Sequence, residues 1–186
     1  GARKLIIGIC NGFQILVKSG LLPGGEEFKQ EASLIINDSG KFEDRWVYLR
    51  STPRHKGLAG VRPCAQGKCV WTKNLPEIIY LPVAHGEGKF VTRDKAMLAR
   101  LKRNGQIVLQ YCDGTGKLRG YPYNPNGSAA HIAGICDETG RIFGLMPHPE
   151  RHIDVSQHPR HPAGRLKQGD GLQIFENGVE YAKKNL

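Results

Sequence analysis

The sequence predicts an α/β fold in which helices cover both faces of one open sheet of mixed direction, giving three layers. Short apolar, β-rich runs alternate with stretches of helical period, which is the pattern of a sheet with crossover helices. Two connections have the composition of tight turns, which join antiparallel strands. The chain has 186 residues, of which 39% are hydrophobic, and this is enough to bury one sizeable core. We therefore expect residues 1–186 to form a single domain.

The first half of the chain is expected to contain one helix and five strands. The strands are predicted at residues 5–7, 32–37, 42–49, 69–72 and 78–83. The helix runs from about Gly12 to Lys18, because Gly20 then acts as a stop. Residues 38–41 have turn composition, so the second and third strands are predicted to pair as a hairpin. Residues 51–68 are rich in Pro, Gly and basic side chains, which is typical of a surface loop.

The second half is predicted to add three strands and two helices. The strands are expected at residues 106–111, 132–136 and 141–146. Asp94 is a suitable N-cap for the first helix, which ends at Asn104-Gly105. The apolar face of that helix consists of Met97, Leu98 and Leu101. The buried side of a terminal helix over residues 170–184 is expected to consist of Leu172, Ile174, Phe175 and Val179.

The stretch from Gly8 to Gly12 has the strand, turn and helix order of a nucleophile elbow, with Cys10 at the position of the nucleophile. Such a sharp turn crowds the backbone, and glycine tolerates this crowding best. A buried cysteine that only packs as a small apolar side chain is the alternative explanation of Cys10. The choice depends on whether the chain also supplies a base.

A candidate base follows the strand at residues 141–146. Pro147 and Pro149 are expected to hold this stretch extended, so that His148 and Glu150 project to the same side. A carboxylate that accepts one imidazole N–H fixes the tautomer and leaves the other nitrogen free to take a proton from a thiol. Strand ends at the carboxyl edge of a sheet are where open α/β folds place their sites. A surface ion pair is the alternative for this couple.

Metal sites are considered for two groups of residues, and no metal is expected. His148 and Glu150 could join the later histidines, but the spacing of His152, His158 and His161 fits no standard ligand pattern. A solvated loop is therefore favoured for these three histidines. Cys64 and Cys69 could pair or bind metal, yet no second closely spaced cysteine pair completes a zinc site.

Residues 84–90 form a glycine-containing loop directly after a strand. Its backbone N–H groups are suited to holding an anion, although an ordinary hairpin turn has the same composition.

The charge and the cysteines limit the classes of protein to consider. The formal net charge is +10, but the basic residues are dispersed and no nucleic-acid-binding motif is present, so no nucleic acid is expected. No apolar run reaches the roughly 20 residues that cross a bilayer, and no signal-peptide pattern begins the chain. An odd count of five dispersed cysteines suits a reducing compartment. We therefore expect no membrane association and a cytoplasmic location.

These motifs together give the chain a clear family resemblance. Cys10, His148 and Glu150 resemble the triad of the class I glutamine amidotransferases, which hydrolyse glutamine. Within that class the chain is similar to the glutaminase subunits of phosphoribosylformylglycinamidine synthases, which serve purine biosynthesis. The matching stretches span nearly the whole chain in order and lie at residues 8–14, 45–47, 82–88, 123–128, 132–136 and 144–151.

The resemblance implies a flavodoxin-like fold and a role for each matching residue. Cys10 is the nucleophile, His148 the base and Glu150 its orienting carboxylate. The backbone N–H of Asn11 contributes to the oxyanion hole. Gln14, His85, Gly86 and Glu87 are implied to bind the substrate glutamine.

The resemblance also implies a partner. Ammonia would pass to an ATP-dependent synthetase subunit, with or without a small accessory subunit, and ATP and Mg²⁺ are expected there. No cofactor is expected in this chain, which contains no Walker-type phosphate loop. Residues 124–128 and the basic surface are candidates for docking. The alternatives are a glutaminase of another pathway and a non-catalytic docking module with the same fold.

The first strand needs neighbours on both sides, and the family places further strands and a second oxyanion donor before it. We therefore expect that an N-terminal portion precedes Gly1 in the natural protein.

Overall fold

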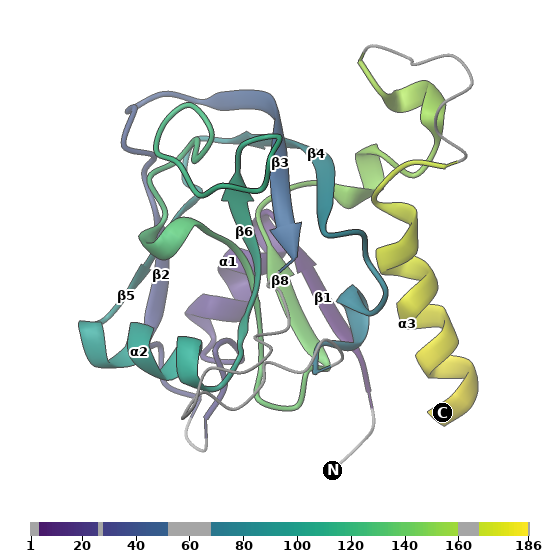
Figure 1. Cartoon of the computed structure of the whole chain (residues 1–186). Helices are drawn as coiled ribbons and strands as arrows, with labels where there is room; N and C mark the ends of the chain where they lie inside the picture. The colour runs from purple at the N-terminus through teal and green to yellow at the C-terminus, as the bar shows by residue number, and fades with distance from the viewer. Residues whose placement is uncertain (1–3, 26–27, 52–67, 160–167, 186) are drawn as a thin grey trace.

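The computed structural model describes residues 4–25, 28–51, 68–159 and 168–185. Within these residues the main sheet has six strands in the order β1-β8-β7-β6-β3-β4 (Figure 1). The strands are β1 (Ile6–Ile9), β3 (Glu43–Ser51), β4 (Ile78–His85), β6 (Ile107–Cys112), β7 (Ile132–Cys136) and β8 (Ile142–Leu145). β1 runs parallel to β8, and all the other neighbours are antiparallel. The predicted mixed sheet is confirmed.

The two faces of the main sheet are covered by different elements. A smaller antiparallel sheet is formed by β2 (Ala32–Ile35) and β5 (Lys89–Thr92). The helices are α1 (Asn11–Lys18), α2 (Lys95–Arg103) and α3 (Leu172–Asn185). One apolar cluster joins α1, α2 and the small sheet to the main sheet, and a second joins α3 to it. Figure 1 shows α2 and α3 on opposite sides of the main sheet. The predicted three-layer arrangement is therefore confirmed.

Helix α2 forms where its sequence signals place it. The Asp94 side chain accepts a hydrogen bond of 2.7 Å from the backbone N–H of Met97, which caps the helix start. Met97 and Leu101 are buried in the cluster under α1 and the small sheet. The helix ends before Gly105, which has a φ of 66° that favours glycine. The predicted cap, apolar face and stop are all present.

The predicted hairpin between residues 32–37 and 42–49 is wrong. Both strands exist, but β2 pairs with β5 and β3 pairs with β4. The segment from β2 to β3 therefore runs antiparallel to the segment from β4 to β5. Residues 36–42 bulge out opposite the three residues 86–88 that link β4 to β5. The turn composition of residues 38–41 belongs to this bulge and not to a hairpin connection.

The predicted strand at residues 69–72 is also wrong. Val70–Thr72 forms a short 3₁₀ helix whose Trp71 is buried against α3 and donates from Nε1 to the carbonyl of Arg141 at 2.9 Å. The β-branched and aromatic residues of this segment are there because the segment is buried, although it lies outside the sheet. Residues 52–67, most of the predicted surface loop, lie outside the described residues.

Helix α3 is present, but its buried side differs from the prediction. Ile174 is buried, whereas Val179 is 53% exposed. Small and polar residues of α3 make the rest of its contact with the 3₁₀ helix at Val70–Thr72. Asn177 Nδ2 donates to the carbonyls of Trp71 and Lys73, at 3.0 and 2.7 Å. A Cβ at Gly178 would lie 2.5 Å from the Trp71 ring. Hydrophobic periodicity alone does not reveal a contact built on Asn and Gly.

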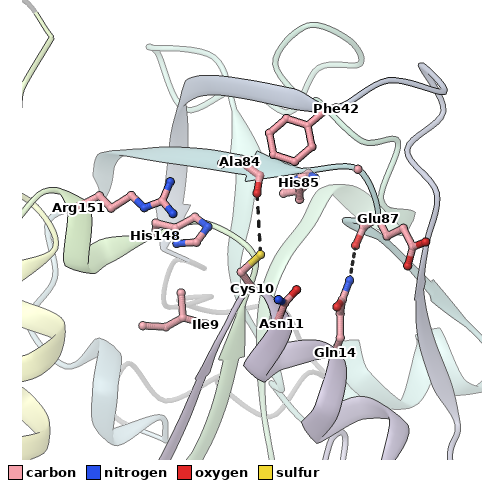
Figure 2. A pocket seen from close by; sticks show the side chains of 11 residues that line it. Ile9, Cys10, Asn11, Gln14, Phe42, Ala84, His85, Glu87, His148 and Arg151 are labelled. Atoms are coloured by element: carbon pink, nitrogen blue, oxygen red, sulfur yellow. Dashed lines mark hydrogen bonds between the residues drawn. The ribbon is translucent and has the colours of Figure 1, made fainter.

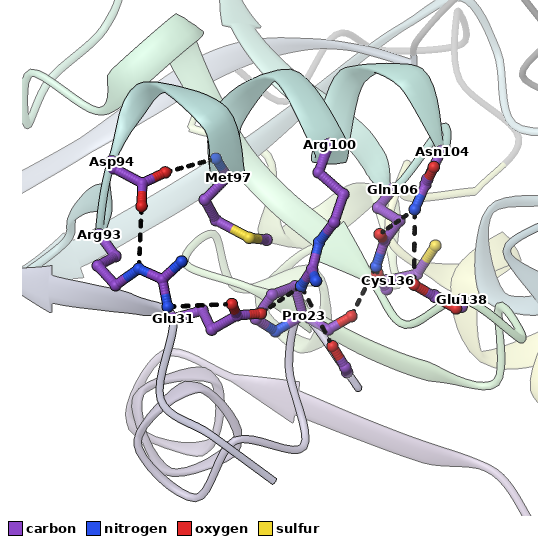
Figure 3. A network of polar contacts seen from close by, with 11 residues as sticks. Pro23, Glu31, Arg93, Asp94, Met97, Arg100, Asn104, Gln106, Cys136 and Glu138 are labelled. Carbon is purple, nitrogen blue, oxygen red and sulfur yellow. Dashed lines mark hydrogen bonds and ion pairs between the residues drawn. The ribbon is translucent and has the colours of Figure 1, made fainter. Parts of the chain in front are cut away.

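A polar network ties the segment after α1 to α2 and to the main sheet (Figure 3). Glu31 forms ion pairs with Arg93 and Arg100 on the α2 side. Gln106, fully buried before β6, donates from Nε2 to the carbonyls of Pro23 and Cys136, at 2.6 and 3.0 Å. These bonds satisfy buried backbone carbonyls and fix the chain that leaves α1.

None of the helices in the described part of the chain is long and apolar enough to cross a membrane.

Candidate active site

Cys10 occupies the turn between β1 and α1, at the carboxyl end of β1. Its backbone has φ 52° and ψ −108°, a conformation that a non-glycine residue adopts only under strain. The Cys10 N–H donates to the carbonyl of Leu145 at 2.9 Å, and its carbonyl accepts from Gln14 in the first turn of α1. This is the geometry of a nucleophile elbow, which holds a side chain above the end of the sheet.

The two glycines of the elbow are not equivalent. A Cβ at Gly8 would lie 2.5 Å from Leu16 Cδ1 and 2.7 Å from the Gly12 backbone, so only glycine allows α1 to approach β1. A Cβ at Gly12 would meet no described atom within 4 Å, and Gly12 has no positive φ. The expectation that both glycines relieve crowding therefore holds for Gly8 alone.

We expect Gly8→Ala to destabilise the protein by about 1–3 kcal/mol, because the added methyl group overpacks the contact between α1 and β1. For a protein of this size the melting temperature should fall by about 2–10 °C. Gly12→Ala is the matched control, and its melting temperature should stay close to that of the wild type. Thermal unfolding of the three proteins is the measurement, and equal stability of both variants would contradict this account of the elbow.

His148 and Glu150 follow β8 and are paired. His148 Nδ1 and Glu150 Oε1 are 2.6 Å apart, and the backbone N–H of His148 donates to the carbonyl of Pro82 on β4 at 2.8 Å. The prediction of an extended stretch is wrong, because Pro149–Arg151 forms one 3₁₀ turn. Proline fits the first position of such a turn, where its missing N–H is not needed. The two side chains meet through this turn.

The electrostatic environment favours the protonated form of His148. Burial by itself lowers the pKa of His148, but the Cys10 thiol and the Glu150 carboxylate outweigh this and raise the pKa to about 9. For Glu150, partial burial raises the pKa, yet the hydrogen bond with His148 outweighs it and the pKa is lowered. His148 Nδ1 is engaged by Glu150, and Nε2 is buried without a hydrogen-bond partner of ordinary length among the described atoms. This nitrogen is available to exchange a proton with a thiol or a ligand.

Cys10 and His148 share one pocket of about 490 Å³, within the size range of small-molecule sites. Figure 2 shows the Cys10 thiol and the His148 imidazole facing this space. The Cys10 Sγ points toward the carbonyl oxygen of Ala84 at 4.0 Å, a weak contact that is easily broken. The lining residues are Ile9, Cys10, Asn11, Gln14, Phe42, Ala84, His85, Gly86, Glu87, His148 and Arg151.

The structure thus brings together every site residue named from the sequence. Seven line the pocket, and Glu150 stands behind His148. As the first residue of α1, Asn11 has a backbone N–H without an intrahelical partner. Phe42 was not expected among the lining residues, because it belongs to no motif with recognisable chemistry. Ala84 begins the glycine-containing loop at residues 84–90, but its apolar side chain gives no sign of a role in the pocket. Arg151 ends the matching stretch at residues 144–151 and was given no role from the sequence; its Nε lies 3.7 Å from Glu150 Oε1.

The loop at residues 86–88 is held from both sides. Gln14 Nε2 on α1 donates to the carbonyl of Glu87 at 2.8 Å (Figure 2). The backbone N–H of Gly88 donates to Asn37 Oδ1 at 2.9 Å, so this amide is not free for an anion. A Cβ at Gly88 would lie 2.3 Å from the His85 ring, which explains the glycine by close packing. The anion-binding interpretation therefore does not apply to the amide of Gly88.

Residues 124–128 do not form a docking surface, because their polar side chains are buried. Asn124, Asn126 and Ser128 are at most 5% exposed. Asn126 Nδ2 donates to the carbonyl of Gly88 at 2.8 Å, and Ser128 Oγ accepts from the backbone N–H of Phe90 at 2.9 Å. Through these hydrogen bonds the buried side chains of this motif hold the backbone at the start of β5.

His85 is buried in the pocket wall and is neutral near pH 7. Its burial, together with the nearby charge of His148, lowers the pKa to about 4. The unfolded chain binds a proton at this residue near pH 6.5, and the folded protein does not. Stability is therefore expected to fall by up to about 3 kcal/mol between pH 6.5 and pH 4. Urea unfolding as a function of pH measures this loss.

In His85→Gln this part of the pH dependence should disappear. The raised pKa of His148 acts in a different window, since its stabilising contribution is complete below about pH 6.5 and is lost as the pH rises through about 9. If the free energy of unfolding changed equally with pH between 4 and 6.5 in the wild type and in His85→Gln, this would contradict the lowered pKa assigned to His85.

The later histidines differ from the solvated loop that was predicted. His152 is fully buried, its Nδ1–H donates to the carbonyl of Tyr80 at 2.8 Å, and its ring contacts Trp46 and His158. His161 lies outside the described residues. No group of three His, Cys, Asp or Glu side chains in the described part of the chain could hold a metal ion. The sequence around His152 has the composition of a loop, but the residue is buried because it covers the edge of β4.

Four cysteines, Cys10, Cys69, Cys112 and Cys136, are free thiols. Cys64 lies outside the described residues, and so does the alternative that Cys64 and Cys69 pair or bind metal.

Comparison with known proteins shows which family this site belongs to. Residues 2–182 match the model of the CobB/CobQ-like glutamine amidotransferase domain. The chain belongs to this family. A solved structure described as PurLQS from Thermotoga maritima has 30% sequence identity and a TM-score of 0.63, covering 96% of this chain and 62% of that one. The predicted flavodoxin-like glutamine amidotransferase fold is thereby confirmed.

Two curated relatives illustrate the similarity in sequence. Phosphoribosylformylglycinamidine synthase subunit PurQ of Dehalococcoides mccartyi is 49% identical over 182 residues, which cover 97% of this chain and 64% of the relative. The subunit of the same name from Archaeoglobus fulgidus is 44% identical over 188 residues, covering 96% of this chain and 63% of the relative. The chain thus spans just under two thirds of the length of these relatives.

Proposed function

We propose that this glutamine amidotransferase chain is the glutaminase component of a phosphoribosylformylglycinamidine synthase. The observation that carries the proposal is the placement of a strained cysteine and a carboxylate-paired histidine in one pocket. The PurQ relatives support the choice of pathway, because they are similar over almost the whole chain. A cytoplasmic location, where purine precursors are made, belongs to the same proposal.

In the proposed cycle Cys10 Sγ attacks the side-chain carbonyl carbon of glutamine. Before this attack the thiol proton has passed to His148 Nε2, whose raised pKa favours the cation, so Cys10 attacks as the thiolate. His148 then gives this proton to the departing nitrogen, so that ammonia leaves and a γ-glutamyl thioester remains. Water then attacks the thioester, which releases glutamate and restores the thiol. Glu150 holds His148 by Nδ1 and stabilises its cation. The backbone N–H of Asn11 stabilises the oxyanion, a contribution typically worth about two to three orders of magnitude in rate.

Gln14, His85, Gly86 and Glu87 are proposed to bind glutamine in the pocket. The ammonia is proposed to pass to an ATP-dependent synthetase subunit that binds ATP and Mg²⁺, in a complex with or without a small accessory subunit. The basic surface remains a candidate for docking. The name of the Thermotoga maritima structure joins PurQ with other subunits, which supports a complex of this kind.

The test is glutamate release from glutamine by the full-length protein, measured with and without the synthetase subunit. The proposal expects glutamate in the presence of the synthetase, together with formylglycinamidine ribonucleotide when ATP is added. Glutamate without that product would point to a glutaminase of another pathway. No glutamate in either case would identify a non-catalytic docking module and overturn the proposal.

A further inference from the structure

Asn37, in the bulge between β2 and β3, is the centre of the hydrogen bonds behind the pocket. Asn37 is only 2% exposed, and both the nitrogen and the oxygen of its side-chain amide form hydrogen bonds. Nδ2 donates to the carbonyls of Lys41 and His85, at 2.9 and 2.8 Å. Oδ1 accepts from the backbone N–H of Gly88 at 2.9 Å and faces His85 Nδ1 at 3.2 Å. The Asn37 N–H also donates to the carbonyl of Gly86 at 3.0 Å.

These contacts determine the tautomer of His85. Two carbonyl oxygens can be satisfied only by a donor, so the amide nitrogen of Asn37 must face them and the amide oxygen must face His85. An amide oxygen only accepts, so His85 Nδ1 carries the hydrogen. Nε2 of the neutral ring is then an acceptor, and it is buried without a partner among the described atoms. His85 lines the pocket, and its unpaired acceptor gains a hydrogen bond when the groups that cover it shift and a ligand donates to it.

We propose that Asn37 is a positioning residue for glutamine binding, which holds His85 in the tautomer whose Nε2 accepts a hydrogen bond from a substrate N–H group. The inference rests on the proposed function, because it concerns the same pocket. Glutamine offers N–H donors at its amino group and at its side-chain amide. Asn37 itself acts through His85 and the loop at residues 86–88.

The charges around His85 make this tautomer sensitive to Asn37. Glu43, the neighbour of His85 across β3 and β4, raises the pKa of the ring and is itself paired with Arg45. His148, from the segment after β8, lowers it. In Asn37→Asp a carboxylate replaces the neutral amide beside Nδ1 and favours the protonated ring. Nε2 then becomes a donor, and the carbonyls of Lys41 and His85 lose their partner.

The test compares Asn37→Asp with the wild type in the full-length protein with its synthetase. We expect the KM for glutamine to rise about 10- to 100-fold at pH 6.5, as for a lost buried hydrogen bond, with kcat changed less than about threefold. The increase should shrink as the pH rises, because His85 then loses its extra proton. Asn177→Asp makes the same change at a buried asparagine within α3, and its KM and pH profile should match the wild type.

A spectroscopic measurement keeps the proposal testable if Asn37→Asp does not fold. In full-length Cys10→Ser protein labelled with ¹⁵N-histidine, His85 is identified by the signal missing from His85→Gln. We expect a protonated Nδ1, an unprotonated Nε2, and a change in the Nε2 shift when glutamine is added. A protonated Nε2, or a folded Asn37→Asp with wild-type KM, would overturn the inference. Absence of glutamate release by the wild type would instead refute the proposed function, and the tautomer would still be measurable.

Discussion

Replacement of Cys10 by serine is expected to lower glutamine hydrolysis by the full-length protein by about four to six orders of magnitude. Serine keeps the shape of the side chain in the elbow, but its hydroxyl is a far weaker acid than a thiol. A pKa of about 9 lets His148 hold a proton taken from a thiol, but it leaves His148 far too weak a base to ionise a serine hydroxyl before the attack. Glutamate release measures the loss, and labelling by a glutamine analogue that carries an electrophile should disappear with it.

Cys112 provides the matched control for labelling. It is a free thiol on β6, fully buried, and burial raises its pKa to about 11. Cys112→Ser is therefore expected to keep both glutamate release and labelling. Labelling that persists undiminished in Cys10→Ser would refute the assignment of the nucleophile, wherever else the reagent reacts.

The elbow and its partners could be predicted from sequence because their signals are local. Gly8 and Cys10 lie in one short motif, and His148 and Glu150 lie in another. Each motif follows an apolar strand, and the parallel pairing of β1 with β8 then brings the two strand ends together. The carboxyl edge of a sheet is the usual place for such a site, so the meeting of the motifs followed from general rules.

The support of the pocket could not be predicted in the same way, because it depends on pairing between distant segments. β2 and β3 each have a strand-like sequence, but neither sequence indicates which strand it pairs with. In the structure β2 pairs with β5, and β3 pairs with β4. The bulge that carries Asn37 exists only because of that pairing. Asn126 and Gly88 are likewise 38 residues apart and meet only in the folded chain. Polar residues that hold a loop from behind give no periodic signal in sequence.

Glu150→Gln is expected to lower kcat/KM for glutamine by about 10²- to 10⁴-fold while the protein stays folded, as for other orienting carboxylates in catalytic triads. The amide keeps the size of the side chain but removes the charge that stabilises the His148 cation and fixes its Nδ1–H.

The same variant should change the pH dependence of the reaction. In the wild type His148 keeps its proton up to a pKa of about 9, so activity that needs this cation should decline only above that pH. Without Glu150, burial and the positive charge of Arg151 both act to lower the His148 pKa, and the alkaline limit should move toward neutral pH. Glu138→Gln, at an exposed carboxylate beside Asn104, should leave rate and profile unchanged. An unshifted alkaline limit in Glu150→Gln would mean that another group sets the proton affinity of His148, and that Glu150 serves only to orient the ring.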